Sequence, residues 1–278
     1  MSSYEDYSRS SAAYDHTRPA QGVEIIRRVL SQNPVPLEAQ VLVDAGCGTG
    51  QYTAALSNEL YRIRAFDLNE GMLSTARGKL EPEIAAGHID LRQASIDELP
   101  ISDESADAIM VNQVLHHLVD DPAQGWPAHQ KVFSEFARVL KPGGRIVINS
   151  CSHRQLGEGF WYYCLIPNAL DRVRKKTLDL DPLAHLLRRS GFIEIRHEAA
   201  EKLIMQGDAY FDAKRVLDPR WRDGDSIWAL ATEAELQDAL EKTRTLLEAG
   251  KLEKFMRHHD KRRAQVNQLS FTWAQKNS

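Results

Sequence analysis

The residues best suited to chemistry are three glycines, Gly46, Gly48 and Gly50, in the segment VDAGCGTGQYT at 43–53. Glycine lets a backbone turn tightly and lie against a ligand. A helix is expected directly after this segment, and the first turn of a helix offers N–H groups that no helical carbonyl accepts. The segment therefore predicts a loop that binds a small ligand through its backbone.

The spacing of these glycines argues against two common nucleotide-binding loops. A dinucleotide fingerprint reads G-x-G-x-x-G, and its third glycine would fall on Gln51. A P-loop reads G-x-x-x-x-G-K-[ST], and the chain has no such run. Asp44 stands at the start of the loop, where a carboxylate would repel a pyrophosphate and attract an ammonium group. The charge therefore favours a ligand with a cationic, amino-acid-like end over a dinucleotide.

A second carboxylate, Asp67, ends the next expected strand, in IRAFD at 63–67. An acidic residue about 20 positions after a glycine loop suits bidentate hydrogen bonding to ribose hydroxyls. We therefore expect a ligand with a ribose near Asp67 and an amino-acid-like group near Asp44.

Short strands that alternate with helices must position these residues. Apolar runs predict strands at 41–44, 63–67, 89–94, 107–112, 145–150, 192–198 and 269–276. Helices are predicted at about 51–59, 69–79 and 129–140, and the KPGG segment at 141–144 breaks the last of them. This alternation is typical of βαβ units, in which ligands bind at the carboxyl ends of parallel strands. We predict an α/β fold with a doubly wound, mostly parallel, Rossmann-like sheet of seven strands.

The remaining segments are interpreted as elaborations of one domain over residues 1–278. Residues 1–39 would form a helical N-terminal cap, 40–150 the ligand-binding core and 151–278 the substrate-side half. Segment 200–268 is charged and rich in helical patterns, and it is interpreted as a helical insertion before the last strand. Thr232 and Glu235, at the start of its clearest helix, have the spacing of a capping box.

Composition excludes several classes of protein. The formal net charge is −4 over 278 residues, which argues against nucleic acid as a partner. No apolar run approaches the roughly 20 residues of a membrane helix. The three cysteines are isolated, so neither a metal site nor a disulfide framework is expected. The first residues lack the apolar stretch of a signal peptide, which favours a cytoplasmic location.

Five motifs together resemble those of class I S-adenosylmethionine-dependent methyltransferases. They are DAGCGTG at 44–50, the acidic strand end at Asp67, the LP of IDELP, NQVLHHL at 112–118 and VLKPGGRIVI at 139–148. They cover residues 40–150 continuously, and SGF at 190–192 extends the match. The resemblance implies S-adenosylmethionine as cofactor and a small molecule as substrate.

The resemblance also implies roles for single residues. The methionine part of the cofactor would lie on the loop, and the family pattern assigns cofactor contacts to Asp44, Gly46, Cys47, Gly48, Gly50, Asp67, Leu68, Met72, Ser95, Ile96 and Asn112. Asp67 would accept from the ribose hydroxyls, Leu68 and Met72 would flank the adenine, and Asn112 would lie near the sulfonium. The backbone N–H of Ile96 would face the adenine. The family usually has an acidic residue where this chain has Ser95, so that contact is weaker, water-mediated or made by Asp97.

Two residues of YDHTRP at 14–19 match a segment that folds over the cofactor in many members of the family. Tyr14 and Arg18 are the candidates, and Arg18 would reach the cofactor carboxylate. The alternative is a packing tyrosine and a surface arginine.

Residues after the fourth and fifth strands are candidates for the reaction and the substrate. His116 would face the methyl-transfer pocket as a general base or a substrate contact, whereas His117 is interpreted as a packing residue. The aromatic residues Trp161, Tyr162 and Tyr163 could hold an apolar substrate, or a cation against their ring faces. Core packing is the alternative for two of the three.

The predicted function is transfer of a methyl group from S-adenosylmethionine to an N, O or S atom of a small molecule. Three alternatives compete with it. A nicotinamide-dependent oxidoreductase is disfavoured by Gln51. A non-catalytic cofactor-binding protein of the same fold, and a cofactor-binding enzyme of another reaction such as a rearrangement, remain compatible with the motifs.

Overall fold

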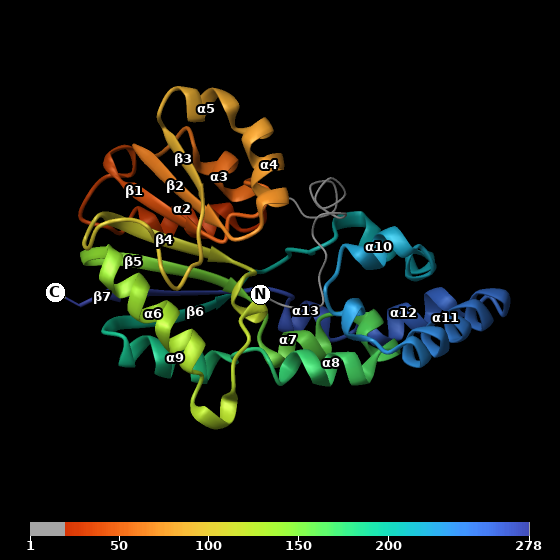
Figure 1. The fold of residues 1–278 in the computed structure, drawn as a ribbon. Helices are drawn as coiled ribbons and strands as arrows, with labels where there is room; N and C mark the ends of the chain where they lie inside the picture. Colours follow the sequence, from red (N-terminus) through yellow and green to blue (C-terminus); the bar gives the residue numbers. More distant parts are fainter. Residues whose placement is uncertain (1–19, 278) are drawn as a thin grey trace.

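Seven strands form one sheet in the computed structural model of the chain, in the order β3-β2-β1-β4-β5-β7-β6 (Figure 1). The structure describes residues 20–277. The strands are β1 (Val41–Ala45), β2 (Arg62–Asp67), β3 (Ile89–Gln93), β4 (Ala106–Asn112), β5 (Leu140–Ser150), β6 (Phe192–Ala199) and β7 (Ser270–Lys276). Strands β1 to β5 are mutually parallel, and β7 runs antiparallel between β5 and β6. The predicted mostly parallel sheet of seven strands is confirmed.

Some helices cover the two faces of this sheet, and others lie beside it. The helices are α2 (Val23–Leu30), α3 (Gln51–Leu56), α4 (Glu70–Lys79), α5 (Glu81–Ala85), α6 (Pro127–Val139), α7 (His153–Glu158), α8 (Pro167–Arg174), α9 (Leu180–Arg189), α10 (Pro219–Asp223), α11 (Glu233–Glu248), α12 (Leu252–His259) and α13 (Arg263–Val266). None of the helices within residues 20–277 combines the length and apolar character needed to cross a lipid bilayer.

Alternate residues of the central strands point to two separate hydrophobic clusters. Val43 of β1 packs in a cluster with Phe133 of α6, whereas Leu42 belongs to a cluster with Ile26 of α2. Because both faces are covered, the central strands carry near-continuous apolar runs rather than an alternation of apolar and polar residues. Because both faces of these strands are buried, the strand ends that carry the polar residues are held in fixed positions at one edge of the sheet.

Strand β5 begins earlier than the sequence predicts. The sequence predicts that the KPGG segment separates the preceding helix from a strand at 145, but Leu140 already pairs with Ala106 of β4. The register then shifts before Arg145 pairs with Ala108. Gly143 adopts a positive φ of 77° within this irregular start. A glycine can take that conformation inside a strand, so the segment bulges instead of ending the pairing.

Elements α10 to α13 lie in the chain between β6 and β7 and form a lobe beside the sheet (Figure 1). A third hydrophobic cluster joins this lobe to residues 156–173, and it includes Trp161, Tyr162, Tyr210, Trp221 and Trp228. The insertion therefore buries its aromatic residues against the segment that follows β5.

Only half of the predicted capping box forms at the start of α11. The Thr232 hydroxyl accepts a hydrogen bond from the Glu235 N–H at 3.2 Å. The Glu235 carboxylate instead accepts from the N–H groups of Asn168 and Ala169, at 2.7 and 3.2 Å, at the start of α8. The Glu235 side chain, which the local sequence predicts to cap α11, therefore caps the start of α8 instead.

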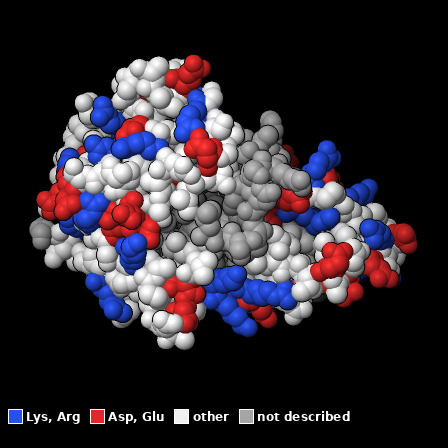
Figure 2. All heavy atoms as spheres, in the orientation of Figure 1, with Lys and Arg blue, Asp and Glu red and all other residues white. Residues whose placement is uncertain are grey.

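Surface charges of opposite sign lie close together across the face that Figure 2 shows. Ion pairs within residues 20–277 include Arg77–Glu70 and Lys131–Asp97. Exposed pairs of this kind add little stability. They leave a mixed charge pattern, unlike the clustered basic surface typical of nucleic-acid-binding domains.

Candidate functional site

The glycine loop joins the carboxyl end of β1 to the start of α3. Gly46 and Cys47 donate backbone hydrogen bonds of 2.8 and 2.9 Å to the Phe66 carbonyl of β2. Gly46 has a φ of 82°, and a Cβ there would come within 2.4 Å of a Val114 methyl carbon. Gly48 has a φ of 54°, but a Cβ there would meet no atom within 4 Å. Hydrogen bonds and close packing thus fix the loop at Gly46 and Cys47, whereas the space beside Gly48 is open.

The Asp44 carboxylate is buried beneath this loop, with 1% of the residue exposed. It accepts a hydrogen bond of 2.6 Å from the Thr53 hydroxyl. Burial raises the pKa of Asp44 to about 7, an effect that the Thr53 hydrogen bond opposes and the negative charge of Asp67 reinforces. No cationic side chain within residues 20–277 pairs with Asp44. A bound ammonium group would provide that positive charge.

The Asp67 carboxylate binds the glycine loop directly. One of its oxygens accepts from the Gly48 N–H at 2.8 Å, and the other accepts from the Asn69 N–H at 2.8 Å. Burial raises the pKa of Asp67, and these backbone donors oppose the rise. Each carboxylate oxygen has two lone pairs, so both oxygens can accept a further hydrogen bond.

A cavity opens beside the loop, and we call it the loop cavity. It encloses about 630 Å³ of empty space, its open mouth included. Its lining consists of Gln21, Asp44, Gly46, Cys47, Gly48, Thr49, Gln51, Tyr52, Asn112, Gln113, Asn149, Met205 and Leu269. The Asn112 amide lies at the end of β4 with both its oxygen and its nitrogen buried, and neither has a hydrogen-bond partner within residues 20–277. Buried polar groups are normally paired, so an unpaired amide at a cavity points to a ligand.

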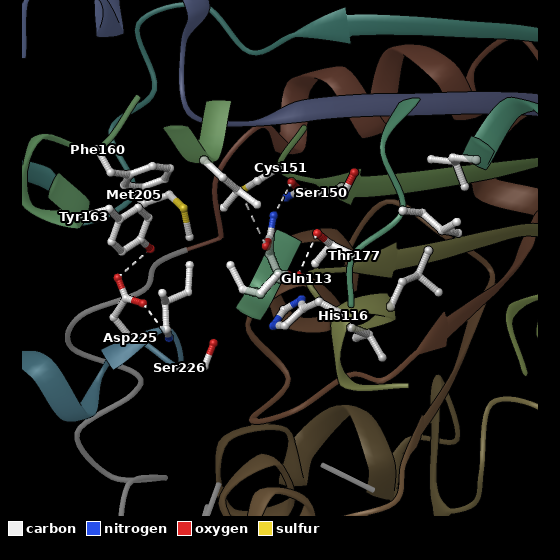
Figure 3. A pocket seen from close by; sticks show the side chains of 18 residues that line it. Gln113, His116, Ser150, Cys151, Phe160, Tyr163, Thr177, Met205, Asp225 and Ser226 are labelled. Carbon is white, nitrogen blue, oxygen red and sulfur yellow. Dashed lines mark hydrogen bonds between the residues drawn. The ribbon is translucent and has the colours of Figure 1, made fainter. Parts of the chain in front are cut away.

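A second cavity, which we call the side cavity, adjoins the first. It encloses about 680 Å³ of empty space, and Figure 3 shows the side chains that line it. Gln113, Asn149 and Met205 line both cavities and so form a shared wall. The side cavity also takes residues from β5, from the segment after it and from the insertion, and most of these are apolar.

The shared wall is held by a chain of hydrogen bonds. The Gln113 side-chain amide donates to the Asn149 amide oxygen at 3.0 Å, and the Asn149 amide nitrogen donates to the Tyr52 hydroxyl at 3.0 Å. The Tyr52 hydroxyl donates in turn to the Gln21 carbonyl at 2.9 Å. Gln113 has a φ of 56°, a region that residues other than glycine rarely adopt. Such conformations cluster at functional sites, where surrounding contacts hold them in place.

Comparison with known proteins agrees with this arrangement. Residues 43–148 match a family model described as a methyltransferase domain. The chain is 27% identical over 212 residues to a demethylmenaquinone methyltransferase of Clavibacter sepedonicus, across 69% of this chain and 82% of the relative. It is 32% identical over 112 residues to a ubiquinone/menaquinone biosynthesis C-methyltransferase of Klebsiella pneumoniae, across 39% of this chain and 41% of the relative.

A solved structure from Anabaena variabilis, assigned to the methyltransferases of an antibiotic biosynthesis pathway, has a TM-score of 0.71 to this chain. The match covers 93% of this chain and 99% of the other at 21% identity, which shows a shared fold. The chain belongs to the class I S-adenosylmethionine-dependent methyltransferases. The methyl donor of this methyltransferase is S-adenosylmethionine, and the loop cavity fits it on two observations. The unpaired Asn112 amide faces the cavity, and the open side of Gly48 leaves room beside the two carboxylates.

The structure brings part of the predicted cofactor residues together around one space. Asp44, Gly46, Cys47, Gly48 and Asn112 line the loop cavity, and Asp67 adjoins it through Gly48. Gly50 caps the start of α3 with a φ of 77°. Leu68, Met72, Ser95 and Ile96 lie outside the lining of the loop cavity, and Leu68 is 40% exposed. Tyr14 and Arg18 lie outside the described residues. The cofactor contacts of all these residues stay predictions.

Ser95 and Asp97, the two residues considered for the adenine contact, are joined by a hydrogen bond. The Ser95 hydroxyl donates a hydrogen bond to the Asp97 carboxylate, which also pairs with the Lys131 ammonium at 2.8 Å. The Lys131 hydrogen bond and the Ser95 hydrogen bond both lower the pKa of Asp97. A ligand that reaches Asp97 therefore meets a carboxylate that is already paired.

The predicted reaction and substrate residues divide between cavity and core. His116 and Tyr163 line the side cavity. Trp161 and Tyr162 are buried in the third hydrophobic cluster and lie outside the lining of both cavities. The structure thus places one of the three aromatic candidates at the side cavity and two in the core.

Sequence reasoning missed several residues of the two cavities. Gln113 and Asn149 each stand at the end of a predicted strand, and that position could have indicated them. Met205 and Asp225 come from the insertion, whose path over the sheet no local pattern reveals. Tyr52 stands next to the glycine loop, but its partners are 31 and 97 positions away in the chain.

Proposed function

We propose that this methyltransferase moves a methyl group from S-adenosylmethionine to a carbon, nitrogen, oxygen or sulfur atom of a small molecule in the side cavity. The observation that carries the proposal is the shared wall, because Gln113, Asn149 and Met205 face both cavities. Methyl transfer needs the donor and acceptor in contact and aligned, and positioning accounts for much of the rate in such reactions. We add carbon to the nitrogen, oxygen and sulfur acceptor atoms predicted from the sequence because one relative is named a C-methyltransferase.

The loop cavity residues would hold the donor. Bound S-adenosylmethionine supplies a methyl group made electrophilic by its positively charged sulfur. Asp44 would attract the ammonium group, Asp67 would accept from the ribose hydroxyls, and Asn112 would pair its amide at the end of β4. The predicted contacts of Leu68 and Ile96 with the adenine extend the site beyond the loop cavity.

His116 would serve the acceptor side. It lines the side cavity and follows β4 by four residues. A neutral imidazole can take the proton of an alcohol, phenol or amine as that atom gains the methyl group. An acceptor that is already ionised needs no base, so His116 would then contact the substrate without moving a proton.

Binding and turnover test this proposal separately. Calorimetry should detect S-adenosylmethionine and S-adenosylhomocysteine and detect no binding of NAD. A screen of small acids, amines, phenols, thiols and enols should then find compounds that cause S-adenosylhomocysteine to form. Binding of NAD alone would exclude the proposed cofactor. Cofactor binding with no product from any compound class would favour the non-catalytic or non-methylating alternative.

We also propose that the insertion and the sheet belong to one domain. The Gln155 amide nitrogen of α7 donates to the carbonyls of Val266 and Leu269, at 3.1 and 2.9 Å. At the other end of the segment, the Gln21 amide nitrogen donates to the Ile204 carbonyl at 2.6 Å. These contacts join both ends of segment 200–268 to the rest of the chain, which supports a single folding unit.

A further inference from the structure

A buried carboxylate stands at one end of the side cavity. Asp225, between α10 and the next helical turn, is 4% exposed. One of its oxygens accepts hydrogen bonds from the hydroxyls of Tyr162 and Tyr163, at 3.2 and 2.9 Å. The other oxygen accepts from the Ile227 N–H at 3.1 Å. Figure 3 shows Asp225 and Tyr163 facing each other at the cavity.

Asp225 has no cationic side chain beside it within residues 20–277. None of the ion pairs formed there includes Asp225, and neither lysine nor arginine lines the side cavity. A buried carboxylate is costly unless charge or hydrogen bonds compensate it. Three donors supply part of that compensation, and the oxygen bound to Ile227 can accept one more hydrogen bond. Within residues 20–277 the Asp225 carboxylate therefore has three hydrogen-bond donors, room for one more and no positively charged partner.

The phenol of Tyr163 remains a donor to this carboxylate. Burial and the negative charge of Asp225 raise the pKa of Tyr163 well above its usual value, so the hydroxyl keeps its proton. A deprotonated tyrosine here would repel Asp225. Tyr163 therefore adds no negative charge of its own to the cavity.

Two aromatic rings flank the same end of the cavity. The rings of Phe160 and Tyr163 have centroids 4.8 Å apart and an interplanar angle of 36°. Both residues line the side cavity, together with the apolar side chains of Leu156, Val173, Leu178, Leu183 and Ile227. Ring faces carry partial negative charge and attract cations. A carboxylate beside two such rings is the chemistry that recognises a protonated amine.

We propose that the side cavity selects small molecules with an apolar body and a protonated amine, and that Asp225 binds the amine beside the packed rings of Phe160 and Tyr163. This inference rests on the proposed function only where it makes such a molecule the methyl acceptor. A protonated nitrogen has no lone pair to attack a methyl group, so the bound amine is not the acceptor atom. Figure 3 shows Gln113 and His116 on the other side of the cavity from Asp225. The acceptor atom would lie at that end, and the substrate is bifunctional.

Three matched probes separate charge from shape. They are 3-phenylpropylamine, 3-phenylpropan-1-ol and 3-phenylpropanoate, which share an apolar body and differ in the terminal group. Calorimetry would use the full chain saturated with S-adenosylhomocysteine. The amine should bind about tenfold more tightly than the alcohol, because the hydrogen bond to Asp225 becomes charge-assisted. The propanoate should show no binding.

Substitution assigns the preference to Asp225. Asp225→Asn should lower the affinity for the amine about tenfold and leave the alcohol within twofold. Tyr162→Phe is the matched control, because it removes one hydrogen bond to Asp225 from a residue outside the cavity lining and should retain the preference for the amine. Unchanged S-adenosylhomocysteine affinity shows that each variant is folded. If Asp225→Asn does not fold, the three probes on the unaltered chain decide.

Equal affinity for amine and alcohol, tighter binding of the propanoate, or no measurable amine binding would overturn the inference. Its failure is distinguishable from that of the proposed function. Methyl transfer to acidic or neutral compounds alone would refute the amine site and leave the methyltransferase activity standing. Amine binding with no methyl transfer to any compound would do the reverse.

Discussion

The side-chain amides of Gln113 and Asn149 are joined by a hydrogen bond of 3.0 Å in the wall between the two cavities. The Gln113 N–H also donates to the Asn149 carbonyl at 2.9 Å, so both the backbone and the side chain of Gln113 depend on β5. These bonds hold Gln113 at its positive φ of 56°. Hydrogen bonds to β5 therefore maintain the strained backbone conformation of Gln113 in this wall.

Replacing Gln113 should damage methyl transfer more than cofactor binding. Gln113→Ala removes the amide pair and should lower kcat/KM about tenfold, the worth of one buried hydrogen bond. S-adenosylhomocysteine affinity should stay within about threefold, because the glycine loop and Asp67 are untouched. Gln113→Asn is the control, since asparagine tolerates positive φ and keeps an amide. A larger loss in cofactor affinity than in turnover would place Gln113 with the donor instead.

Removing the Asp67 carboxylate should weaken cofactor binding. We expect Asp67→Ala to reduce S-adenosylmethionine affinity by about 1–3 kcal/mol, because ribose hydroxyls would lose their acceptor. The variant also loses the 2.8 Å bond to the Gly48 N–H, so its melting temperature should fall as well. Asp90→Ala, which removes a carboxylate paired with Arg92 on β3, is the matched control and should bind the cofactor normally. Unchanged calorimetric affinity in Asp67→Ala would mean that the ribose lies elsewhere.

Cofactor affinity should depend on pH through Asp44. Burial raises the pKa of Asp44 to about 7, so the carboxyl is protonated below that pH and ionised above it. An ammonium group binds the ionised form, and S-adenosylmethionine affinity should therefore rise between pH 6 and pH 7.5 with release of a proton. Calorimetry in buffers of different ionisation enthalpy measures that release. Asp44→Asn should abolish the rise, whereas a profile identical to that of the unaltered chain would contradict the assignment.

The same carboxyl makes a signed prediction for the stability of the cofactor-free protein. The folded pKa of Asp44 is about 7 and its ordinary value is 3.8, so the folded state holds a proton that the unfolded state has released. The free energy of unfolding should therefore fall as the pH rises from about 4 to 7. Thr53→Val removes the hydrogen bond that stabilises the ionised form, and it should extend the fall to higher pH. Urea titrations at several pH values would measure both slopes against Asp44→Asn, in which this contribution is absent.

The strands and the loop could be predicted because their signals are local. The run before Asp44 is apolar since both faces of β1 are covered, and the glycines at 46, 48 and 50 all adopt positive φ. The contributions of Asp225 and Met205 are not local. Both reach the side cavity only because the insertion packs its aromatic residues against the segment after β5. No periodicity within 200–268 encodes that path, so the places of Asp225 and Met205 in the site could not be predicted from the sequence.

Glu235 likewise contacts residues that lie far from it in the sequence. Glu235 is 7% exposed, and its carboxylate accepts hydrogen bonds from the N–H groups of Asn168 and Ala169 at the start of α8. Negative charge is stabilising at a helix N-terminus, where N–H groups lack intrahelical partners. Glu235→Ala should therefore lower the free energy of unfolding by about 2–3 kcal/mol, because the half-buried N–H of Asn168 and the buried N–H of Ala169 lose a charged acceptor. Thr232→Ala removes only the local cap of α11 and should cost about 1 kcal/mol.

Two optical probes turn this comparison into a test of the single folding unit. Three of the five tryptophans, Trp161, Trp221 and Trp228, lie in the third hydrophobic cluster, so fluorescence reports mainly on the insertion and its partner segment. Far-ultraviolet circular dichroism reports on helices throughout the chain. If the insertion and the sheet unfold together, both probes should show one urea transition at the same midpoint, and Glu235→Ala should shift both equally. A fluorescence transition that moves alone would show that the insertion unfolds separately from the sheet.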